Sequence, residues 1–158
     1  MTRAFIALGS NLGDPRQQVL DAMDALQRLP DSRVLQRSRL YRTPPWGVLD
    51  QPDFINAVVA IDTGLSPHAL LDALHAIEQQ AGRVRLERNG PRTLDLDLLY
   101  MDGVRINDAQ LTVPHPRIAE RAFVLLPLAD VAPELQLPAG TVAELLARVD
   151  IHGCVALA

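Results

Sequence analysis

The chain has 158 residues and a net charge of −4, with 48% hydrophobic and 22% charged residues. A chain of this length buries roughly 70% of the surface that its unfolded form exposes, so we expect one domain over residues 1–158. No apolar run is long enough to span a bilayer and no signal peptide is evident, which predicts a cytoplasmic protein. The acidic charge disfavours a surface built for nucleic acid. Cys154 is the single cysteine, so no intramolecular disulfide can form, and the lack of lysine excludes lysine-dependent catalysis.

The first half of the chain predicts a strand, a helix and two further strands. Residues 4–8 are apolar and end at a turn, after which residues 16–29 carry apolar side chains at helical spacing. Residues 33–42 and 54–62 are expected strands, and the second is rich in β-branched and aromatic residues. The prolines and glycine of residues 43–47 predict an irregular loop between them.

A second helix and a fourth strand complete the pattern. Residues 66–82 begin with a Ser-Pro cap and end at a glycine, as helices commonly do. Leucine and aspartate alternate over residues 93–100, which predicts a strand with one buried face. Asp102 and Gly103 predict a tight hairpin turn into residues 104–106. The order strand, helix, strand, strand, helix, strand is that of the α+β, ferredoxin-like split β-α-β sandwich.

The last third is less regular and predicts additional C-terminal helices. We expect a loop over residues 111–116, partly helical structure over residues 117–128, and a short capped helix over residues 141–148.

Asp95 and Asp97 are the strongest candidates for chemistry. Residues two apart on a strand point to the same side, so these carboxylates converge while Leu94, Leu96 and Leu98 enter the core. Paired carboxylates suit Mg²⁺, which is commonly held by one or two carboxylates together with substrate phosphates. The alternative is the solvated outer face of an amphipathic strand.

Cationic groups lie on both sides of that strand in the sequence. A rigid Pro-His-Pro segment follows it, and guanidinium and imidazole groups are good donors to phosphate oxygens. A solvated basic loop, or a patch for an RNA backbone, is the other interpretation. The cationic candidates are Arg83, Arg85, Arg88, Arg92, His115, Arg117 and Arg121.

Trp46, Phe54 and Phe123 are three of only six aromatic residues, and Asn56 follows Phe54 on the same strand face. Rings that stack on a planar heterocycle, with an amide that reads its edge, would bind a pterin or a similar base. The same aromatics could equally be ordinary core residues.

Five segments, in this order along nearly the whole chain, resemble the 6-hydroxymethyl-7,8-dihydropterin pyrophosphokinase family of folate biosynthesis. The segments are Ala7-Leu8-Gly9-Ser10-Asn11-Leu12-Gly13, Tyr41-Arg42-Thr43-Pro44-Pro45-Trp46-Gly47, Gln51-Pro52-Asp53-Phe54-Ile55-Asn56, Gly90-Pro91-Arg92-Thr93-Leu94-Asp95-Leu96-Asp97 and Val113-Pro114-His115-Pro116-Arg117.

The resemblance implies a monomeric, ferredoxin-like enzyme that uses ATP and two Mg²⁺ ions, transfers pyrophosphate to the pterin, and releases AMP. It places both ions on Asp95 and Asp97 and gives Arg83 and Arg92 a part in the transfer. It places the nucleotide among Glu78, Arg83, Arg85, Arg88, Arg92, Leu98, Thr112, His115, Arg117 and Arg121. It places the pterin among Thr43, Pro44, Pro45, Trp46, Phe54, Asn56, Asp95 and Phe123.

The chain departs from the family pattern at Asn89, where many members have tryptophan, and at Phe54, where tyrosine is frequent. Two other classes of protein fit the same residues less well. An RNA-binding ferredoxin-like module conflicts with the acidic charge and with Asp95 and Asp97, which would repel an RNA backbone. A regulatory small-molecule sensor without catalysis would differ by forming no AMP.

Overall fold

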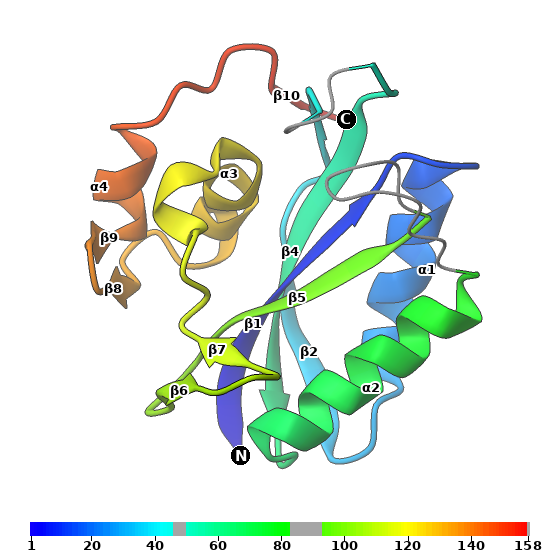
Figure 1. The fold of residues 1–158 in the computed structure, drawn as a ribbon, viewed down its shortest axis with the longest axis vertical. Helices are drawn as coiled ribbons and strands as arrows, with labels where there is room; N and C mark the ends of the chain where they lie inside the picture. Colours follow the sequence, from blue (N-terminus) through cyan, green and yellow to red (C-terminus); the bar gives the residue numbers. More distant parts are fainter. Residues whose placement is uncertain (46–49, 83–92, 158) are drawn as a thin grey trace.

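The computed structural model describes residues 1–45, 50–82 and 93–157. Its centre is an antiparallel sheet in which β1 (Thr2–Ser10) lies between β4 (Phe54–Thr63) and β5 (Asp95–Met101) (Figure 1). Residues 4–10 of β1 are buried, as expected for a central strand that is covered on both faces. The strand order and the two crossover helices confirm the ferredoxin-like α+β fold.

Two helices cover one face of this sheet. α1 (Pro15–Gln27) is capped by the Asp14 side chain, and α2 (Pro67–Gln80) is capped by the Ser66 side chain. Their apolar faces pack on β1, β4 and β5 through a core that includes Met23, Leu26, Leu70 and Leu74. Leu94, Leu96 and Leu98 belong to this core, which confirms the predicted inward face of the Leu-Asp alternation.

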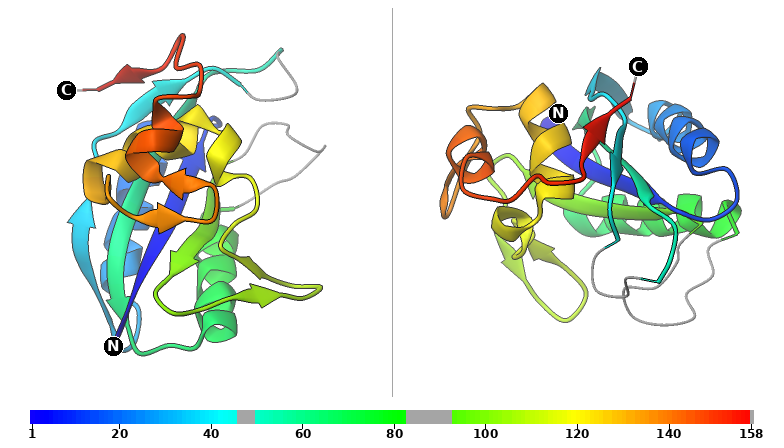
Figure 2. Two further views of the ribbon diagram at one scale, coloured as in Figure 1. Left: turned by 90° about the vertical axis from the view of Figure 1, so that its left-hand side faces the viewer. Right: turned by 90° about the horizontal axis from the view of Figure 1, so that it is seen from above.

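The other face is covered by the C-terminal third of the chain, as Figure 2 shows from two further directions. A 3₁₀ turn, η1 (Ile118–Glu120), leads into α3 (Ala122–Val131), which packs on the sheet together with α4 (Val142–Leu146). A hairpin of β8 (Gln136–Leu137) and β9 (Gly140–Thr141) lies between the two helices in sequence. Within the described residues, no helix is long and apolar enough to span a membrane.

The predicted strand over residues 33–42 is wrong in one respect, because the structure divides it into β2 (Ser32–Arg37) and β3 (Tyr41–Thr43). Both pair with β4, at different places along it. Between them, the Ser38 N–H donates to the Val58 carbonyl (2.9 Å), and the Ser38 hydroxyl accepts from the Val58 N–H (2.9 Å). A side chain that replaces a ladder partner ends regular pairing at this point.

The predicted hairpin at Asp102–Gly103 is also wrong. The turn forms, with Gly103 at φ +73°, but β6 (Ile106–Asn107) pairs with β7 (Thr112–Val113) instead of returning along β5. The edge of β5 is used elsewhere, since the His115 N–H donates to the Leu99 carbonyl at 2.8 Å. The segment predicted as a loop over residues 111–116 therefore contains a short strand, followed by a cis peptide bond before Pro114.

The C-terminal end forms one more strand that no sequence pattern predicts. β10 (Val155–Ala156) pairs with β3 and closes that side of the sheet. The short capped helix predicted over residues 141–148 is confirmed as α4, where Thr141 and Glu144 form a reciprocal capping box.

Candidate functional site

Four strands bring polar residues into one row on the face of the sheet opposite α1 and α2. The register pairs Tyr41 with Asn56, Asn56 with Gly9, and Gly9 with Asp95. Asp97 lies one step further along β5, opposite Ala7. Directly paired residues share a face of a sheet, so Asp95 and Asp97 face the side that α3 covers, as their predicted convergence requires.

Gly9 makes this row possible. A Cβ atom at Gly9 would lie 2.7 Å from Asn56 Oδ1, closer than any real Cβ contact. Asn56 therefore occupies the space that a side chain at Gly9 would need, and its Nδ2 donates to Thr43 Oγ1 at 2.6 Å. Phe54 lies on the same side, 4.0 Å from that Cβ position. Three predicted site residues, Thr43, Phe54 and Asn56, thus come together around one glycine.

Cationic groups adjoin the two aspartates. The pKa of His115 is lowered to about 4, mainly by burial and in addition by the charges of Arg121 and Arg117, while Asp95 acts in the opposite direction. His115 Nδ1 accepts a hydrogen bond from the Arg117 N–H (3.2 Å), so the neutral ring carries its proton on Nε2 and can donate there.

Arg121 is a partly buried member of this group. Burial and the charge of Arg117 lower its pKa, while Asp97, Glu120 and Asp95 oppose that shift. Its Nε atom is buried and has no hydrogen-bond partner among the described residues. A buried N–H donor without a partner is costly, so an anionic ligand at this place would satisfy it.

The first cavity, of about 330 Å³, opens at the edge of β5. Glu78, at 2% exposure, forms its inner end, and Glu78 Oε2 accepts a hydrogen bond from the Leu96 N–H at 2.8 Å. The cavity joins five of the predicted residues with residues of α2 and of the β6–β7 connection. It is lined by Leu71, His75, Glu78, Leu96, Asp97, Leu98, Gln110, Leu111, Thr112, His115 and Pro116.

The second cavity, of about 440 Å³, lies between β3, the start of α3 and the C-terminal segment. It brings together four of the predicted pterin residues, Thr43, Pro44, Pro45 and Phe123. Phe54 and Asn56 do not line it, but Asn56 joins it through the hydrogen bond to Thr43. Both cavities have volumes in the usual range for small-molecule sites, about 300–1,000 Å³.

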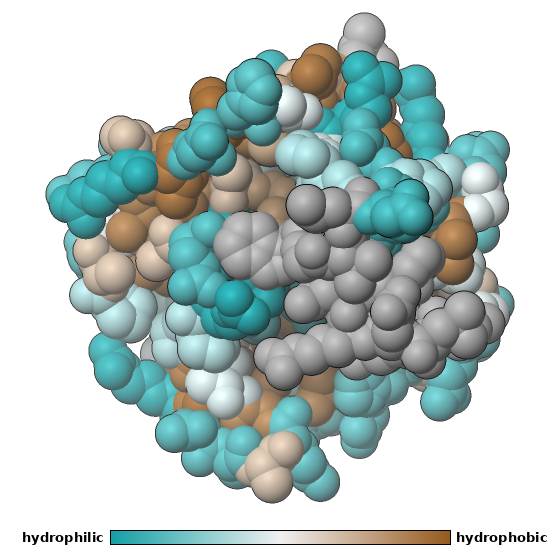
Figure 3. Space-filling model, turned by 45° about the horizontal axis from the view of Figure 1, so that its top comes forward, coloured by the Kyte–Doolittle hydropathy of each residue, from teal (hydrophilic) through white to brown (hydrophobic). Residues whose placement is uncertain are grey.

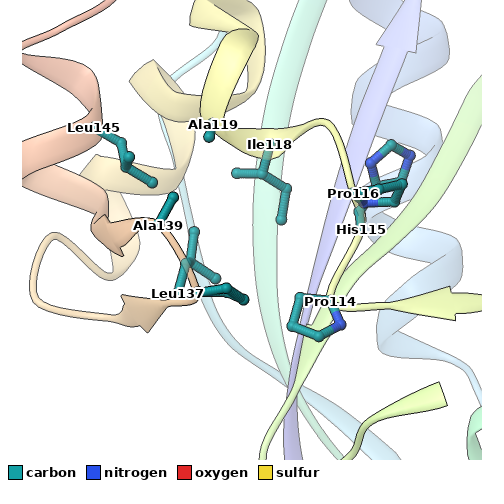
Figure 4. Close-up of a pocket in the computed structure, with 9 residues that line it drawn as sticks. Pro114, His115, Pro116, Ile118, Ala119, Leu137, Ala139 and Leu145 are labelled. Carbon is teal, nitrogen blue, oxygen red and sulfur yellow. The ribbon is translucent and has the colours of Figure 1, made fainter. Parts of the chain in front are cut away.

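A third cavity, of about 220 Å³, lies behind the Pro-His-Pro segment (Figure 4). Ile118, Leu137 and Leu145 give it an apolar lining, and the His115 ring points away from them. The apolar lining of this cavity offers few partners to an anionic ligand. The His115 imidazole can instead bind a ligand in the first cavity, which it lines together with Asp97.

Several predicted site residues lie outside the described residues: Trp46, Arg83, Arg85, Arg88 and Arg92. Described residues near both segments, 46–49 and 83–92, form hydrogen bonds with residues at the end of β1. The Ser10 hydroxyl donates to the Thr93 carbonyl, and Asn11 Nδ2 donates to Gln51 Oε1 (2.8 Å) and to the Pro52 carbonyl (2.9 Å). Figure 3 shows the surface with this end of the molecule turned forward. Hydrophilic residues (teal) lie at several places around the centre of that view.

Sequence reasoning missed some residues of the two cavities. No sequence motif singles out His75, which shares a cavity with Glu78 three residues later, a spacing that places both on one side of a helix. Gln110 and the C-terminal residues Asp150 and His152 carried no signal, because only the fold brings them to a cavity.

The donor set fits Mg²⁺. Asp95 and Asp97 supply hard oxygen ligands on one face of a strand. Within residues 1–45, 50–82 and 93–157, no group of three or more His, Cys, Asp or Glu side chains could hold a metal ion by itself. Two carboxylates alone leave most of an octahedral shell open to phosphate oxygens and water, which is how Mg²⁺ is commonly bound.

Fold and site together define a ferredoxin-like α+β protein in which Asp97 lines one cavity and a row of residues leads from Asp95 toward a second. Residues 5–133 match the family model described as 7,8-dihydro-6-hydroxymethylpterin-pyrophosphokinase. The chain belongs to this family.

Relatives of similar length agree with that assignment. The 2-amino-4-hydroxy-6-hydroxymethyldihydropteridine pyrophosphokinase of Methylorubrum extorquens is 50% identical over 153 residues, which cover 97% of each chain. The Pseudomonas aeruginosa protein of the same name is 52% identical over 152 residues, covering 96% of this chain and 94% of the relative.

Among solved structures, Plasmodium falciparum HPPK-DHPS with pteroate is similar in fold, with a TM-score of 0.74 at 16% identity. The match covers 93% of this chain but 42% of the Plasmodium chain, so this protein spans less than half of that longer one.

Proposed function

We propose that this protein transfers pyrophosphate from ATP to 6-hydroxymethyl-7,8-dihydropterin, giving the pterin diphosphate and AMP in folate biosynthesis. Membership of the family, with relatives that carry this activity in their names, supports the reaction. The structural observation that carries it is that Asp97 lines one cavity, while the row from Asp95 through Gly9 to Asn56 leads to Thr43 of the other. A transfer between two substrates needs both of them beside one charged centre.

The first cavity is assigned to the nucleotide. Glu78, Leu98 and Thr112 line it and would contact the base and ribose, while His115 and Asp97, which also line it, would face the phosphates. Arg117 and Arg121 add positive charge near the same aspartates. Arg83, Arg85, Arg88 and Arg92 are proposed to contact the triphosphate, with Arg83 and Arg92 aiding transfer, but they lie outside the described residues.

The second cavity, with the row beside it, is assigned to the pterin. Pro44, Pro45 and Phe123 supply apolar surface for a flat ring, and Asn56 supplies an amide. Thr43 and Phe54 adjoin that amide, Asp95 ends the row toward the nucleotide, and Trp46 lies outside the described residues.

The chain's own residues act by placement and charge. The row from Asn56 to Asp95 would direct the pterin hydroxyl toward the β-phosphorus for in-line attack, and His115 Nε2 and Arg121 Nε would donate to phosphate oxygens. Asp95 and Asp97 would hold two Mg²⁺ ions, which neutralise phosphate charge when bound. No side chain is required as a covalent nucleophile.

The test is to incubate the protein with ATP, Mg²⁺ and hydroxymethyl-dihydropterin and to follow AMP. We expect AMP to form only when all three are present, and to stop when EDTA removes the metal. Asp97→Asn should reduce turnover by at least about a hundredfold, since electrostatic groups of this kind contribute on the order of 10²–10³. Asp102→Asn, on the exposed end beyond the same strand, is the matched control and should keep full activity. AMP formation that persists in EDTA, or in the Asp97 variant, would contradict the proposal.

We further propose that residues 1–158 form one domain that acts as a cytoplasmic monomer. Helices on both faces of one shared sheet support the single domain, and the use of ATP supports the location. Light scattering of the purified protein tests the monomer, and a dimer mass would contradict it.

A further inference from the structure

Three parts of the chain that are far apart in sequence form the walls of the second cavity. Thr43, Pro44 and Pro45 form one wall, and Glu120, Ala122 and Phe123 form another. The third wall is the C-terminal segment, residues 149–154, which contributes Val149, Asp150, His152 and Cys154. The family model matches residues 5–133, so this third wall lies beyond the residues that it matches.

The C-terminal segment is fixed directly to the strand that carries Thr43. β10 pairs with β3, with Val155 opposite Arg42, and the Leu157 N–H donates to the Leu40 carbonyl at 2.8 Å. Figure 1 shows the segment (red) as it passes from α4 to β10. The position of the C-terminal segment is therefore set by β3 as well as by α4.

Its turn also has a defined shape. The Asp150 carboxylate accepts from the His152 N–H at 2.9 Å, and the Cys154 N–H donates to the Ile151 carbonyl at 3.0 Å. Gly153 has φ +82°, and a Cβ atom there would lie 3.4 Å from Pro44 Cγ, so the turn packs closely on the proline of the opposite wall.

The chemistry of the three walls suits a flat, polar heterocycle. Phe123, Pro44 and Val149 are apolar, whereas Asp150 and His152 place a carboxylate and an imidazole at the rim. A pterin has apolar faces and hydrogen-bonding edges, so this combination matches its two kinds of surface.

We propose that residues 149–154 are a third wall of the pterin subsite and contribute to its affinity for the pterin but not for ATP. This inference rests on the proposed function. The nucleotide cavity contains no residue of the segment, so the two affinities can be separated.

The test uses Cys154, the chain's only cysteine, as a reporter on this wall. Leu35→Cys adds a second thiol on the exposed strand β2, remote from both cavities, and serves as an internal control. Because burial raises the pKa of the Cys154 thiol, alkylation by N-ethylmaleimide is followed near pH 9, with each site read by peptide mass spectrometry.

All arms contain Mg²⁺ and a non-hydrolysable ATP analogue, with or without hydroxymethyl-dihydropterin. At a pterin concentration ten times its Kd, occupancy should slow alkylation of Cys154 about elevenfold and leave the control thiol unchanged. Protein already alkylated at Cys154 should lose at least about tenfold in pterin affinity and keep its affinity for the analogue.

Equal alkylation rates at Cys154 with and without a pterin that calorimetry shows to bind would overturn the inference. So would unchanged pterin affinity after alkylation. Either result leaves the proposed function intact if AMP still forms, whereas failure of the unmodified protein to bind pterin or to form AMP would count against the proposed function itself.

Discussion

Gly9 is the single residue on which the row of site residues most depends. Its φ is not in the left-handed region, so glycine is needed here for space rather than for backbone freedom. Asn56 Oδ1 fills that space and Asn56 Nδ2 holds Thr43, so one absent side chain allows three strands to present their groups together.

Gly9→Ala should therefore displace Asn56. We expect overpacking to lower the free energy of unfolding by about 1–3 kcal/mol and the KM for the pterin to rise, with a smaller change in the KM for ATP. Urea unfolding and the AMP assay measure these effects. Gly64→Ala is the matched control, because its Cβ would meet Asp31 Cβ at 3.3 Å at the opposite end of the sheet. A pterin KM that rises equally in both variants would contradict this role for Gly9.

His115 is held neutral by its surroundings. Its folded-state pKa is about 4 against an ordinary value of 6.5, with burial as the largest cause and Arg121 and Arg117 next. A lowered pKa means that the unfolded chain binds the proton more readily, so the contribution to stability is present above pH 6.5 and is lost as the pH falls toward 4.

His115→Gln should remove that part of the pH dependence. In metal-free protein, the wild-type free energy of unfolding should fall from pH 6.5 to pH 4 more steeply than that of the variant, by up to about 1.4 kcal/mol per pH unit. Urea unfolding across this range gives both curves, and the other three histidines are common to them. Parallel curves would show that His115 is protonated equally in both states.

At the scale of elements, α2 holds β5 in place through a buried carboxyl group. Glu78 and Leu96 are both almost fully buried, and the Glu78 carboxylate accepts the N–H of the residue between the two aspartates. The contact fixes the edge strand from the side that has no neighbouring strand.

Glu78→Ala would leave the Leu96 N–H buried without that partner. We expect a loss of about 1–3 kcal/mol in the free energy of unfolding and a higher KM for ATP. Glu78→Gln keeps an acceptor oxygen and should retain most of the stability, while Gln79→Ala, exposed on the same helix, should change neither quantity. Equal losses for the Ala and Gln variants would show that the charge, rather than this hydrogen bond, is what matters. Urea unfolding curves give the free energy of unfolding of each variant, and initial rates give its KM for ATP.

At the scale of the whole molecule, the sheet has a hydrophobic core on each face, and the candidate site shares the face that α3 covers. α1 and α2 pack on one face of the sheet, whereas α3 packs on the other face, the one that carries Asp95 and Asp97. Of the two cavities assigned to the substrates, one lies against α2 and β7 at this end of the sheet, and the other lies against α3 and the C-terminal segment.

ATP should consequently stabilise the protein strongly only when Mg²⁺ balances the negative charges of the triphosphate and of Asp95 and Asp97. Mg·ATP at a hundred times its Kd should add about 2.7 kcal/mol to the free energy of unfolding. ATP in EDTA should add much less, because the triphosphate would meet Asp95 and Asp97 without a cation. Thermal unfolding with a non-hydrolysable analogue measures both, and equal stabilisation with and without Mg²⁺ would contradict the assignment of the phosphates to this place.

The sequence by itself determined the elements whose signals are local. Alternating Leu and Asp predicted which face of β5 is buried, the caps at Ser66 and Thr141 marked two helix starts, and the order of elements indicated the ferredoxin-like fold. These signals depend on neighbours within a few residues, so they can be read without the tertiary structure.

Only the tertiary structure decided what depends on distant partners. Ser38 ends β2 because it meets Val58, and β6 leaves β5 because His115 takes its place at Leu99. Likewise, Asn56 fills the space beside Gly9, and Glu78 accepts its hydrogen bond from Leu96. β10 pairs with β3, which lies more than a hundred residues earlier in the chain. Long-range packing and hydrogen bonding leave no periodic trace in the sequence, which is why the aspartates could be found from their spacing and the cavities beside them could not.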